Sequence, residues 1–346
     1  MTIRTISWDD TGGPDGRGVL RLLDQTLLPS RTEDRVVRDV DGLVAAIEEL
    51  AVRGAPALGV AGAMGVLVAL DQAEREGWGE ERLQAEIDRV RHARPTAVNL
   101  AWGVDAVRPL LAQGREAVLA AARRVAAEDE AANRELSRRA ADWLLARMDR
   151  DRVRVLTHCN AGVLAASAWG TALGVVRELQ ARGRLEVVYA DETRPLLQGA
   201  RLTAWELAAE GVEHRVQVDG AAASTVLRGL VDCAVVGADR VAANGDVANK
   251  IGTLAVGLAC REAGIPLLVA APWSTVDLTM ADGDGIEIEE RSGEEVTTVA
   301  GRRVAPEESA GFNPAFDVTP ARFVSAVATE RGVVEPAGGA VMSDLS

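Results

Sequence analysis

The chain has 346 residues, of which 48% are hydrophobic, and its 52 acidic and 38 basic residues give a net charge of -14. This length and composition indicate a globular protein with room for two domains, and the negative charge without a concentrated basic patch disfavours nucleic acid and anionic membranes as partners. No signal-peptide pattern opens the chain and no uninterrupted run of about 18 apolar residues occurs, so we expect a cytoplasmic protein that binds no membrane.

The first half of the chain has a mainly helical pattern after a short β-prone segment at residues 19–23. Asp41 is a suitable N-cap for a helix over residues 42–52, because apolar residues recur there at helical spacing. Residues 116–148 are rich in Ala, Arg, Glu and Leu, a composition that favours helix. We therefore predict a smaller, mainly helical N-terminal domain over residues 1–147.

A glycine-containing helix is predicted between these two. It opens at Pro56, since proline is favoured in the first turn of a helix. Gly59, Gly62 and Gly65 follow at intervals of three. Glycine is a poor helix former, so this spacing indicates close packing of the helix against another backbone.

Short apolar runs alternate with helical patterns in the second half of the chain. The runs are VRVLTH, LEVVYA, HRVQV, DCAVVG and PLLVAA. This alternation predicts an α/β fold with a Rossmann-like, doubly wound, mostly parallel sheet in a C-terminal domain over residues 148–346. Asn244-Gly245 predicts a tight hairpin turn, residues 281–310 an extended loop or β excursion, and Thr319 the cap of one last helix.

Several catalytic signatures are absent from the sequence. It contains no GxGxxG after a strand, no GxxxxGK[ST], no HExxH and no GxSxG, which disfavours dinucleotide oxidoreductases, P-loop kinases, zinc hydrolases and α/β-hydrolases. The three cysteines, Cys159, Cys233 and Cys260, have no metal-binding spacing. We expect no cofactor, no metal and no disulfide, and we interpret Cys233 and Cys260 as small core residues.

Cys159 follows a predicted strand and precedes Asn160-Ala161-Gly162, where a helix is expected to begin. A thiol at a helix N-terminus is near the positive end of the macrodipole, which favours the thiolate and makes it a usable base or nucleophile. A buried cysteine that only fills the corner between sheet and helix is an equally good interpretation. His158 is expected to point to the opposite side of the strand, so no Cys/His pair is implied.

Asp239 ends the apolar run DCAVVG. A carboxyl at the end of a buried strand is well placed for desolvation, which would raise its pKa and let it act as an acid. Pairing with Arg240 or capping of a turn explains the residue equally well on this segment alone. The argument for chemistry comes from convergence, since the loops at the carboxyl ends of such strands line one crevice.

Further polar residues fall just past strand ends or at helix starts, and three cationic segments among them suggest sites for an anion. The polar residues are Asp191, Glu192, Thr193, Arg194, Gln198, Asp219, Asn249 and Lys250. The cationic segments are Lys250 before a helix expected near Ile251, Arg53-Gly54-Ala55 before Pro56, and Arg94-Pro95-Thr96. Each alone could be structural, but three of them in a strongly acidic protein favour recognition of a phosphorylated metabolite.

The motifs in their order resemble those of the methylthioribose-1-phosphate isomerase family, which belongs with the alpha, beta and delta subunits of initiation factor 2B. The resemblance covers nearly the whole chain, from LLDQTLLP to ERGVV. It rests on RGAPALG, RPTAVNL, LTHCNAG, DETRPLLQGARLTAWEL, GADRVAANGDVANKIGT, AAPWSTVD, IEIEER and FDVTPARFVSAVATERGV.

The resemblance implies an aldose-ketose isomerase, an intramolecular oxidoreductase that converts 5-methylthioribose 1-phosphate to 5-methylthioribulose 1-phosphate in methionine salvage. It implies that Asp239 is the acid that opens the ring and that Cys159 assists hydrogen transfer from C2 to C1. It also implies a homodimer whose partner is a small sugar phosphate. The implied substrate-binding residues are Arg53, Gly54, Ala55, Arg94, Gln198, Asn249 and Lys250.

Two departures from the family pattern concern the 5-position of the sugar. Met64 stands where an aromatic residue is common, and Gly220 follows Asp219 where the family usually has Asn. The alternatives are a related isomerase acting on 5-deoxyribose 1-phosphate or ribose 1,5-bisphosphate, and a non-catalytic regulatory subunit of the initiation factor 2B type. Retention of both Cys159 and Asp239 argues against the regulatory subunit.

Overall fold

The computed structural model describes residues 3–13, 16–95 and 97–346. The chain divides into two compact units by its internal contacts. The first is Met1–Arg134 with Ala161–Gly170, and the second is Glu135–Asn160 with Thr171–Ser346. The domain boundary expected after residue 147 stays a prediction, because compactness does not establish that a unit folds alone.

The first unit combines a small antiparallel sheet with a set of helices. The sheet has the order β1-β2-β3, formed by β1 (Ile6–Asp9), β2 (Val19–Leu23) and β3 (Asp34–Val37). The helices are α1 (Val40–Glu48), α2 (Ala55–Glu76), α3 (Glu80–His92), α4 (Val98–Val107) and the N-terminal part of α5 (Arg115–Leu145), with short 3-10 helices η1 (Arg108–Gln113) and η2 (Val163–Ala165).

Helix α1 begins earlier than its sequence indicated. Its N-cap is Asp39, whose Oδ1 accepts a hydrogen bond of 2.7 Å from the Gly42 amide, and Asp41 lies inside the first turn. Both aspartates stand before the same apolar stripe. The extended backbone of Asp39 decides which of them caps, because an N-cap residue must have non-helical dihedrals.

Helix α2 is the core of the first unit. By length and composition it could cross a bilayer, but 78% of its most apolar window is buried inside the structure, as in the core helix of a globular unit. Its glycines have the packing role that their spacing predicted. A Cβ added at Gly62 would collide with the Leu100 carbonyl oxygen of α4, and one added at Gly103 of α4 would collide with the Gly59 carbonyl oxygen.

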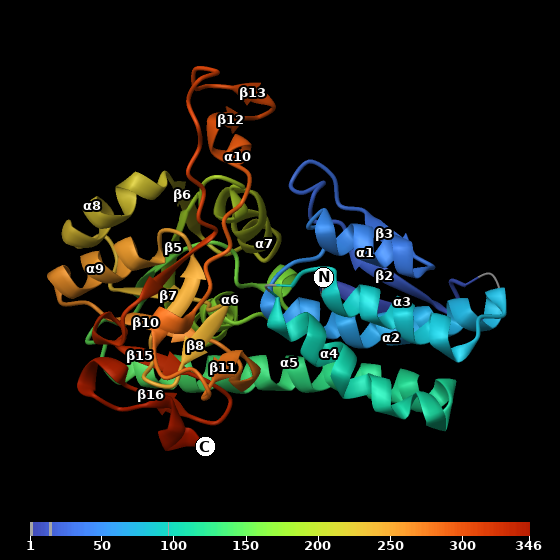
Figure 1. Cartoon of the computed structure of the whole chain (residues 1–346). Helices are drawn as coiled ribbons and strands as arrows, with labels where there is room; N and C mark the ends of the chain where they lie inside the picture. Colours follow the sequence, from blue (N-terminus) through green and yellow to red (C-terminus); the bar gives the residue numbers. More distant parts are fainter. Residues whose placement is uncertain (1–2, 14–15, 96) are drawn as a thin grey trace. The chain divides into compact units, whose positions relative to one another are not determined.

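The second unit is built on a seven-stranded sheet with the order β16-β15-β10-β7-β4-β5-β6 (Figure 1). Every neighbouring pair is parallel except β15 with β16. The strands are β4 (Val153–Thr157), β5 (Leu185–Asp191), β6 (His214–Gln217), β7 (Cys233–Val236), β10 (Leu267–Ala270), β15 (Ala326–Ala328) and β16 (Val333–Val334). The predicted fold class, a helical region followed by a doubly wound sheet, is confirmed.

Helices connect these strands, and the longer ones pack on the sheet. Helix α6 lies against β4, β5, β7 and β10, while α9 lies against β7 and β10 beside α8. The helices of the second unit are the C-terminal part of α5, α6 (Ala172–Ala181), α7 (Ala204–Ala209), α8 (Ala222–Leu227), α9 (Thr253–Ala263) and α10 (Glu294–Thr297). Single turns are the π-helix η3 (Gly199–Thr203) and the 3-10 helices η4 (Asp219–Ala221), η5 (Trp273–Thr275), η6 (Gly283–Gly285), η7 (Ala321–Phe323), η8 (Pro336–Gly338) and η9 (Met342–Leu345).

A second, smaller sheet with the order β11-β8-β9-β14 follows β7. Its strands are β8 (Arg240–Ala242), β9 (Val247–Lys250), β11 (Val276–Asp277) and β14 (Phe316–Thr319). Strands β8 and β9 form the hairpin predicted at Asn244-Gly245. The excursion predicted over residues 281–310 contains α10 and the hairpin of β12 (Thr298–Val299) and β13 (Arg302–Arg303), which project from the unit in Figure 1.

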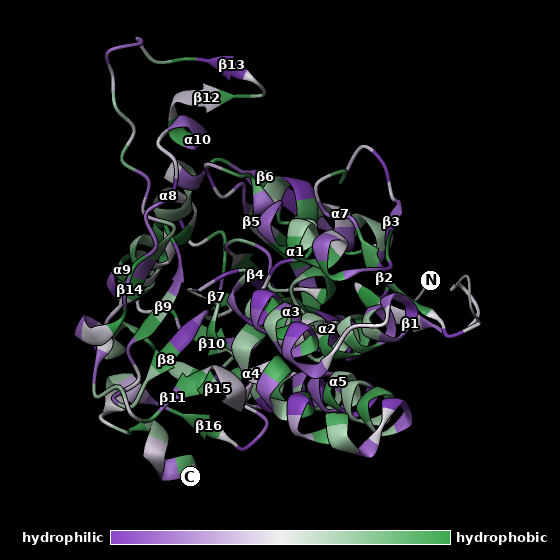
Figure 2. Ribbon diagram, turned by 45° about the vertical axis from the view of Figure 1, so that its right-hand side comes forward, coloured by the Kyte–Doolittle hydropathy of each residue, from purple (hydrophilic) through white to green (hydrophobic). Residues whose placement is uncertain are grey.

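The prediction of a last helix after Thr319 is wrong. The chain there forms η7 and then β15, whose three residues are buried and pair with β10. Figure 2 shows β10 and β15 as hydrophobic strands and β13 as a hydrophilic one. An alanine-rich segment that completes a buried parallel sheet takes strand geometry, since pairing and burial outweigh local helix propensity.

The close approach of α2 and α4 gives a test of packing in the first unit. Gly103→Ala is expected to lower the free energy of unfolding by about 3 kcal/mol, because the new methyl group meets backbone that cannot move aside. Gly79→Ala, which has no atom within 4 Å of its new Cβ, is the control and should cost less than about 1 kcal/mol. Urea unfolding of both variants measures the difference, and equal effects would contradict the packing role.

Candidate active site

The two residues proposed for chemistry follow adjacent strands. Cys159 comes two residues after the end of β4, and Asp239 comes three residues after the end of β7. These strands are parallel neighbours, with Leu156 paired to Ala234. Neighbouring strands lie about 4.8 Å apart, so both loops leave the same edge of the sheet side by side.

The order of the sheet changes direction between these same two strands. From β4 the chain builds outward through β5 and β6, then returns to place β7, β10 and β15 on the other side of β4. Loops on either side of such a reversal diverge and leave a crevice, which is where ligands bind in open α/β sheets. Cys159 and Asp239 therefore flank the expected ligand crevice of the second unit.

Cys159 is held in an unusual backbone conformation. Its φ is +64°, a left-handed value that a residue other than glycine adopts only when its surroundings impose it. Its amide donates to Thr193 Oγ1 at 2.9 Å, and its carbonyl oxygen accepts from Thr203 Oγ1 at 2.7 Å. Both partners lie in the segment that follows β5. This segment therefore determines the position of Cys159.

The helix expected directly after Cys159 is absent from the described residues that follow it. The chain makes only the three-residue 3-10 turn η2 before α6 begins at Ala172. The argument that a helix macrodipole activates this thiol is therefore wrong. The expected roles of Cys233 and Cys260 are confirmed, since both are buried, and burial raises the pKa of Cys233 well above the ordinary value and that of Cys260 to about 12.

A buried ion pair supports the residue after Cys159. Asn160 Nδ2 donates to Glu206 Oε1 at 2.8 Å, and Arg177 Nη2 donates to Glu206 Oε2 at 2.7 Å. Glu206 is fully buried. A buried carboxylate needs such partners because an unpaired charge in the interior is strongly destabilising, so this arrangement keeps the Cys159 loop in place.

Asp239 lies at the start of the second sheet and is half-buried. Its amide donates to the Ala248 carbonyl oxygen at 2.9 Å, which brings it next to strand β9 and hence to Asn249 and Lys250. The following Arg240 donates to Asp277 Oδ2 at 2.8 Å. The structure thus places Asp239, Asn249 and Lys250 on adjoining backbone.

Gln198 carries a buried polar atom that needs a partner. The residue is 6% exposed, and its Oε1 accepts no hydrogen bond from the residues that the structure describes. An amide oxygen accepts hydrogen bonds from hydroxyl or amine groups. Buried unsatisfied acceptors are rare in proteins, so this atom is suited to receive a hydroxyl group of a ligand.

The anion site expected at the helix after Lys250 is filled by the protein itself. Asp317 accepts hydrogen bonds from the amides of Gly252 and Leu254, at 2.7 and 3.1 Å, which caps the N-terminus of α9. Lys250 Nζ donates to the Ala315 carbonyl oxygen at 2.8 Å. The prediction of phosphate binding is therefore wrong for the amides of Gly252 and Leu254, because a carboxylate from β14 already accepts from them, and the binding role of Lys250 stays a prediction.

The remaining predicted residues belong to the first unit. Arg53, Gly54 and Ala55 lie at the start of α2, where the N-cap residue Gly54 has no side chain of its own to cap the helix. Gly54 has a φ of +94° and serves as N-cap, where a Cβ would collide with Ala165. Arg94 follows α3 and is half-buried, and Thr96 of the same predicted segment lies outside the described residues. The ligand-binding roles of these residues stay predictions.

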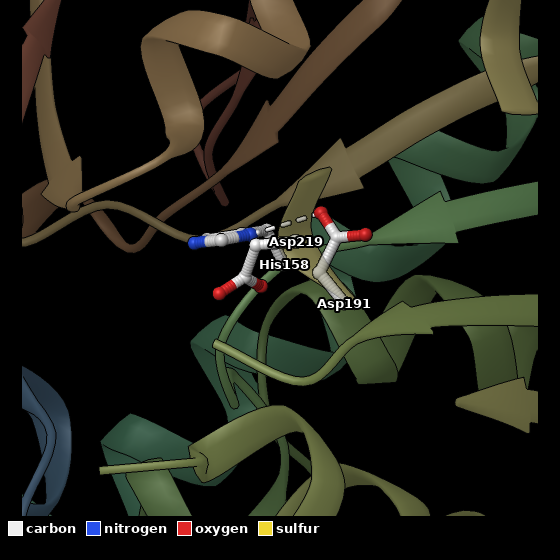
Figure 3. Close-up of side chains that lie close together, drawn as sticks. All are labelled: His158, Asp191 and Asp219. Carbon is white, nitrogen blue, oxygen red and sulfur yellow. Dashed lines mark hydrogen bonds and ion pairs between the residues drawn. The ribbon is translucent and has the colours of Figure 1, made fainter. Parts of the chain in front are cut away.

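Three residues at or just past the ends of β4, β5 and β6 form a cluster that the sequence did not predict, although Asp191 and Asp219 were both expected past strand ends. His158, Asp191 and Asp219 have side-chain N and O atoms within 4.8 Å of one another (Figure 3). His158 Nδ1 is 2.9 Å from Asp191 Oδ2, and its Nε2 is 2.8 Å from the Ile251 carbonyl oxygen. Burial alone would lower the pKa of His158, but the hydrogen bond and charge of Asp191 and the Ile251 carbonyl raise it. The sequence signal was a polar run ending a buried strand.

Comparisons with known proteins place the chain in context. The model of the initiation factor 2 subunit family matches residues 51–336. A methylthioribose-1-phosphate isomerase of Anaeromyxobacter dehalogenans is 49% identical over 344 residues, covering 99% of this chain and 97% of the relative. A probable bifunctional methylthioribose-1-phosphate isomerase/methylthioribulose-1-phosphate dehydratase of Nocardia farcinica is 53% identical over 331 residues, which are 95% of this chain but only 59% of that protein's length.

Two solved structures are also similar. The 5-methylthioribose 1-phosphate isomerase of Pyrococcus horikoshii superposes with a TM-score of 0.85 at 37% identity, covering 96% of this chain and 92% of that one. A chain described as the delta subunit of translation initiation factor eIF-2B from A. fulgidus has a TM-score of 0.84 at 40% identity, with coverages of 97% and 96%. Both likenesses extend over nearly the whole chain.

The raised pKa of His158 predicts how stability depends on pH. A histidine whose pKa is higher in the folded than in the unfolded protein stabilises the folded state. This contribution is complete below the unfolded pKa of about 6.5 and is lost as the pH rises through the folded pKa. The stability difference between wild type and His158→Gln should therefore be largest below about pH 6.5 and shrink at higher pH. Urea unfolding across a pH series measures it, with His214→Gln as the histidine control, and a difference that grows with pH would contradict it.

The support of Cys159 by Thr193 predicts a stability cost. Thr193→Val removes the acceptor of the buried Cys159 amide and should lower the free energy of unfolding by about 1–3 kcal/mol. Thr279→Val removes an exposed hydroxyl group that bonds Asp277 and serves as the matched control with a small effect. Unchanged urea midpoints in both variants would show that the bond to Cys159 does not matter for folding.

Proposed function

The chain belongs to the initiation factor 2 subunit family, and on that premise we propose that it is an isomerase converting 5-methylthioribose 1-phosphate to 5-methylthioribulose 1-phosphate in methionine salvage. The relatives of known name that match along the whole chain support an isomerase of this substrate. The observation that carries the proposal within this molecule is the position of Cys159 and Asp239 in the loops after the two strands that flank the reversal of the sheet.

The chemistry requires an acid first. The substrate is a furanose whose anomeric oxygen carries phosphate, so the ring cannot open by loss of a hemiacetal proton. Asp239 in its protonated form gives a proton to the ring oxygen while the C1–O bond to that oxygen breaks. The half-buried position of Asp239 in the loop after β7, on backbone that adjoins Asn249 and Lys250, suits this role.

Hydrogen then moves from C2 to C1. In one route Cys159 takes the C2 proton as a base, which forms an enediol-type intermediate that is reprotonated at C1. In the other, hydride passes directly from C2 to C1 and Cys159 stabilises the transition state. In both routes the C2 hydroxyl group loses its proton as the C2 carbonyl forms, and this proton replaces the one that Asp239 gave to the ring oxygen. Both routes need Cys159 to be fixed against the sugar, and its constrained backbone supports that requirement.

Binding residues complete the proposal. Gln198 accepts a hydroxyl group of the sugar through its buried Oε1, and Asn249 and Lys250 contact the ligand beside Asp239. Arg53, Gly54, Ala55 and Arg94 bind the phosphate. The position of these residues at the N-terminus of α2 supports this choice, because the amides at a helix N-terminus favour an anion.

A regulatory subunit is the second candidate, favoured by the family and by the solved subunit of eIF-2B to which the chain is similar. A purely binding protein has no need of Cys159 and Asp239 at the same edge of a sheet. Related isomerases of 5-deoxyribose 1-phosphate or ribose 1,5-bisphosphate differ in the group at the 5-position of their substrate, where a second phosphate needs a second cationic pocket. Rates with 5-methylthio, 5-deoxy and 5-phospho substrates separate these isomerases.

A homodimer is part of the proposal. Light scattering of the purified protein checks it.

The proposal predicts activity without added metal or nucleotide. Phosphorus and proton NMR of the purified protein with 5-methylthioribose 1-phosphate should show conversion to a ketose 1-phosphate. Asp239→Asn and Cys159→Ser should each lower the rate at least about 100-fold, because each removes a group that acts on the reacting atoms. Asp282→Asn on an exposed loop and Cys260→Ser in α9 are the matched controls and should keep normal rates. If the wild-type protein does not convert this substrate, the proposal that it is an isomerase is overturned.

Solvent exchange separates the two routes of hydrogen transfer. In deuterium oxide, an enediol route puts deuterium at C1 of the product, whereas a direct hydride shift carries the original hydrogen. Proton NMR of the C1 position measures the label. Deuterium at C1 would favour proton transfer, and its complete absence would count against an enediol that exchanges freely with solvent.

A further inference from the structure

His158 is a buried titratable group that the proposed chemistry does not use. Its side chain is 1% exposed, as is that of Asp191. It stands at the end of β4 directly before Cys159, and Figure 3 shows its ring beside Asp191 and Asp219. A buried polar group of this kind needs a physical explanation, since burying it costs free energy unless its partners are excellent.

Both ring nitrogens of His158 lie at hydrogen-bond distance from an oxygen atom. Nε2 faces the Ile251 carbonyl oxygen, which can only accept. Nδ1 faces Asp191 Oδ2, and the other oxygen of this carboxylate accepts from Gln217 Nε2 at 2.8 Å. A ring that donates to both of these oxygen atoms carries a proton on each nitrogen and is an imidazolium.

The two bonds join three separate segments of the second unit. One segment is the end of β4 with Cys159, the second is the end of β5 with Asp191, and the third is the turn from β9 into α9 with Ile251. The same β5 segment holds the Cys159 amide, because Thr193 Oγ1 accepts from Cys159 and donates to the Asp191 carbonyl oxygen at 3.0 Å. The turn containing Ile251 follows Asn249 and Lys250 directly.

Packing confirms that the turn is shaped around the ring. Gly252 has a φ of +108°, and a Cβ added there would lie 2.7 Å from His158 Cε1 and 2.8 Å from Nε2. Only a residue without a side chain allows the backbone of this turn to approach the imidazole so closely. Asp317 then fixes the far side of the same turn by accepting from the Gly252 amide.

We propose that His158 is a positioning residue: its two ring nitrogens tie the ends of β4 and β5 to the turn after Lys250, and so hold Cys159 and the Asn249-Lys250 pair in the arrangement that the reaction needs. This proposal rests on the proposed isomerase for its effect on rate. His158 itself touches neither substrate nor reacting atoms in this role. It fixes the relative positions of three loops at one edge of the sheet.

A metal site is the competing interpretation of the same cluster, and the hydrogen bonds argue against it. Asp219 Oδ1 accepts from the Thr193 amide at 2.7 Å, and its Oδ2 accepts from the Arg194 amide at 2.6 Å. Both nitrogens of His158 are occupied by acceptors. A metal ligand would have to give up these bonds and, for His158, a proton.

The first test needs no substitution. Nitrogen NMR of protein labelled at its three histidines should show one ring, that of His158, with protons on both nitrogens at pH 7.5 and protected from solvent exchange. A wild-type His158 ring with a proton on only one nitrogen would overturn the proposal that both nitrogens donate hydrogen bonds. Assignment comes from the loss of that signal in His158→Gln.

The second test uses kinetics. Glutamine cannot donate to both acceptors at once, so His158→Gln should lower kcat about 100-fold with a smaller change in KM, because loss of register by roughly 1 Å is enough for such an effect. Asp191→Asn should stay close to the wild-type kcat, since its amide can donate to a neutral His158 and preserve both bonds. His214→Gln is the matched control. A folded His158→Gln protein with normal kcat, or an Asp191→Asn protein as slow as His158→Gln, would overturn the positioning role.

Thiol chemistry separates this proposal from the isomerase itself. The rate at which iodoacetamide alkylates Cys159, followed by peptide mass spectrometry, should change several-fold in His158→Gln and not in Asp191→Asn. Cys233 and Cys260 are buried, so their continued protection reports that the variants are folded. An unchanged Cys159 rate in folded His158→Gln would contradict the proposal. Failure of the wild type to isomerise would reject the proposed function, whereas the NMR and alkylation results would still decide the role of His158.

Discussion

The parallel pairing of β4 with β7 is the constraint on which the rest of the candidate site depends. Because the chain builds outward from β4 in one direction and then returns to its other side, two segments about 80 residues apart in sequence end next to each other. The thiol of Cys159 and the carboxyl of Asp239 share one edge for this reason. Residues from β5, β9 and β14 are then arranged around that edge by backbone pairing and buried hydrogen bonds.

The edge is held by buried polar groups that satisfy one another. Arg177 with Glu206 supports one side of the Cys159 loop, and His158 with Asp191 joins its base to the neighbouring segments. Such networks are poor sources of stability, yet they define one geometry because every member loses its partners in any other. The family contains both isomerases and initiation factor subunits on this framework, so activity resides in the loops rather than in the fold.

The sequence was most informative where a pattern is local. Alternating apolar runs identified the strands of the large sheet, and the glycine spacing in α2 correctly indicated contact between helices. Predictions failed where a distant segment decides the outcome. Asp317 caps α9 from a strand more than 60 residues away, and pairing with β10 turns an alanine-rich segment into β15. The contacts of His158 involve Asp191 and Ile251 from two other segments, so the polar run at the end of β4 could mark the residue but not its partners.

The central claim is that a sugar phosphate binds and reacts at the carboxyl ends of β4 and β7. A crystal structure of the Asp239→Asn protein soaked with 5-methylthioribose 1-phosphate tests it most directly. The account predicts the sugar in this crevice, with C2 about 3.5 Å from Cys159 Sγ, its ring oxygen beside residue 239 and a hydroxyl group on Gln198 Oε1. A sugar bound elsewhere, with Cys159 and residue 239 both out of reach of C1, C2 and the ring oxygen, would contradict it.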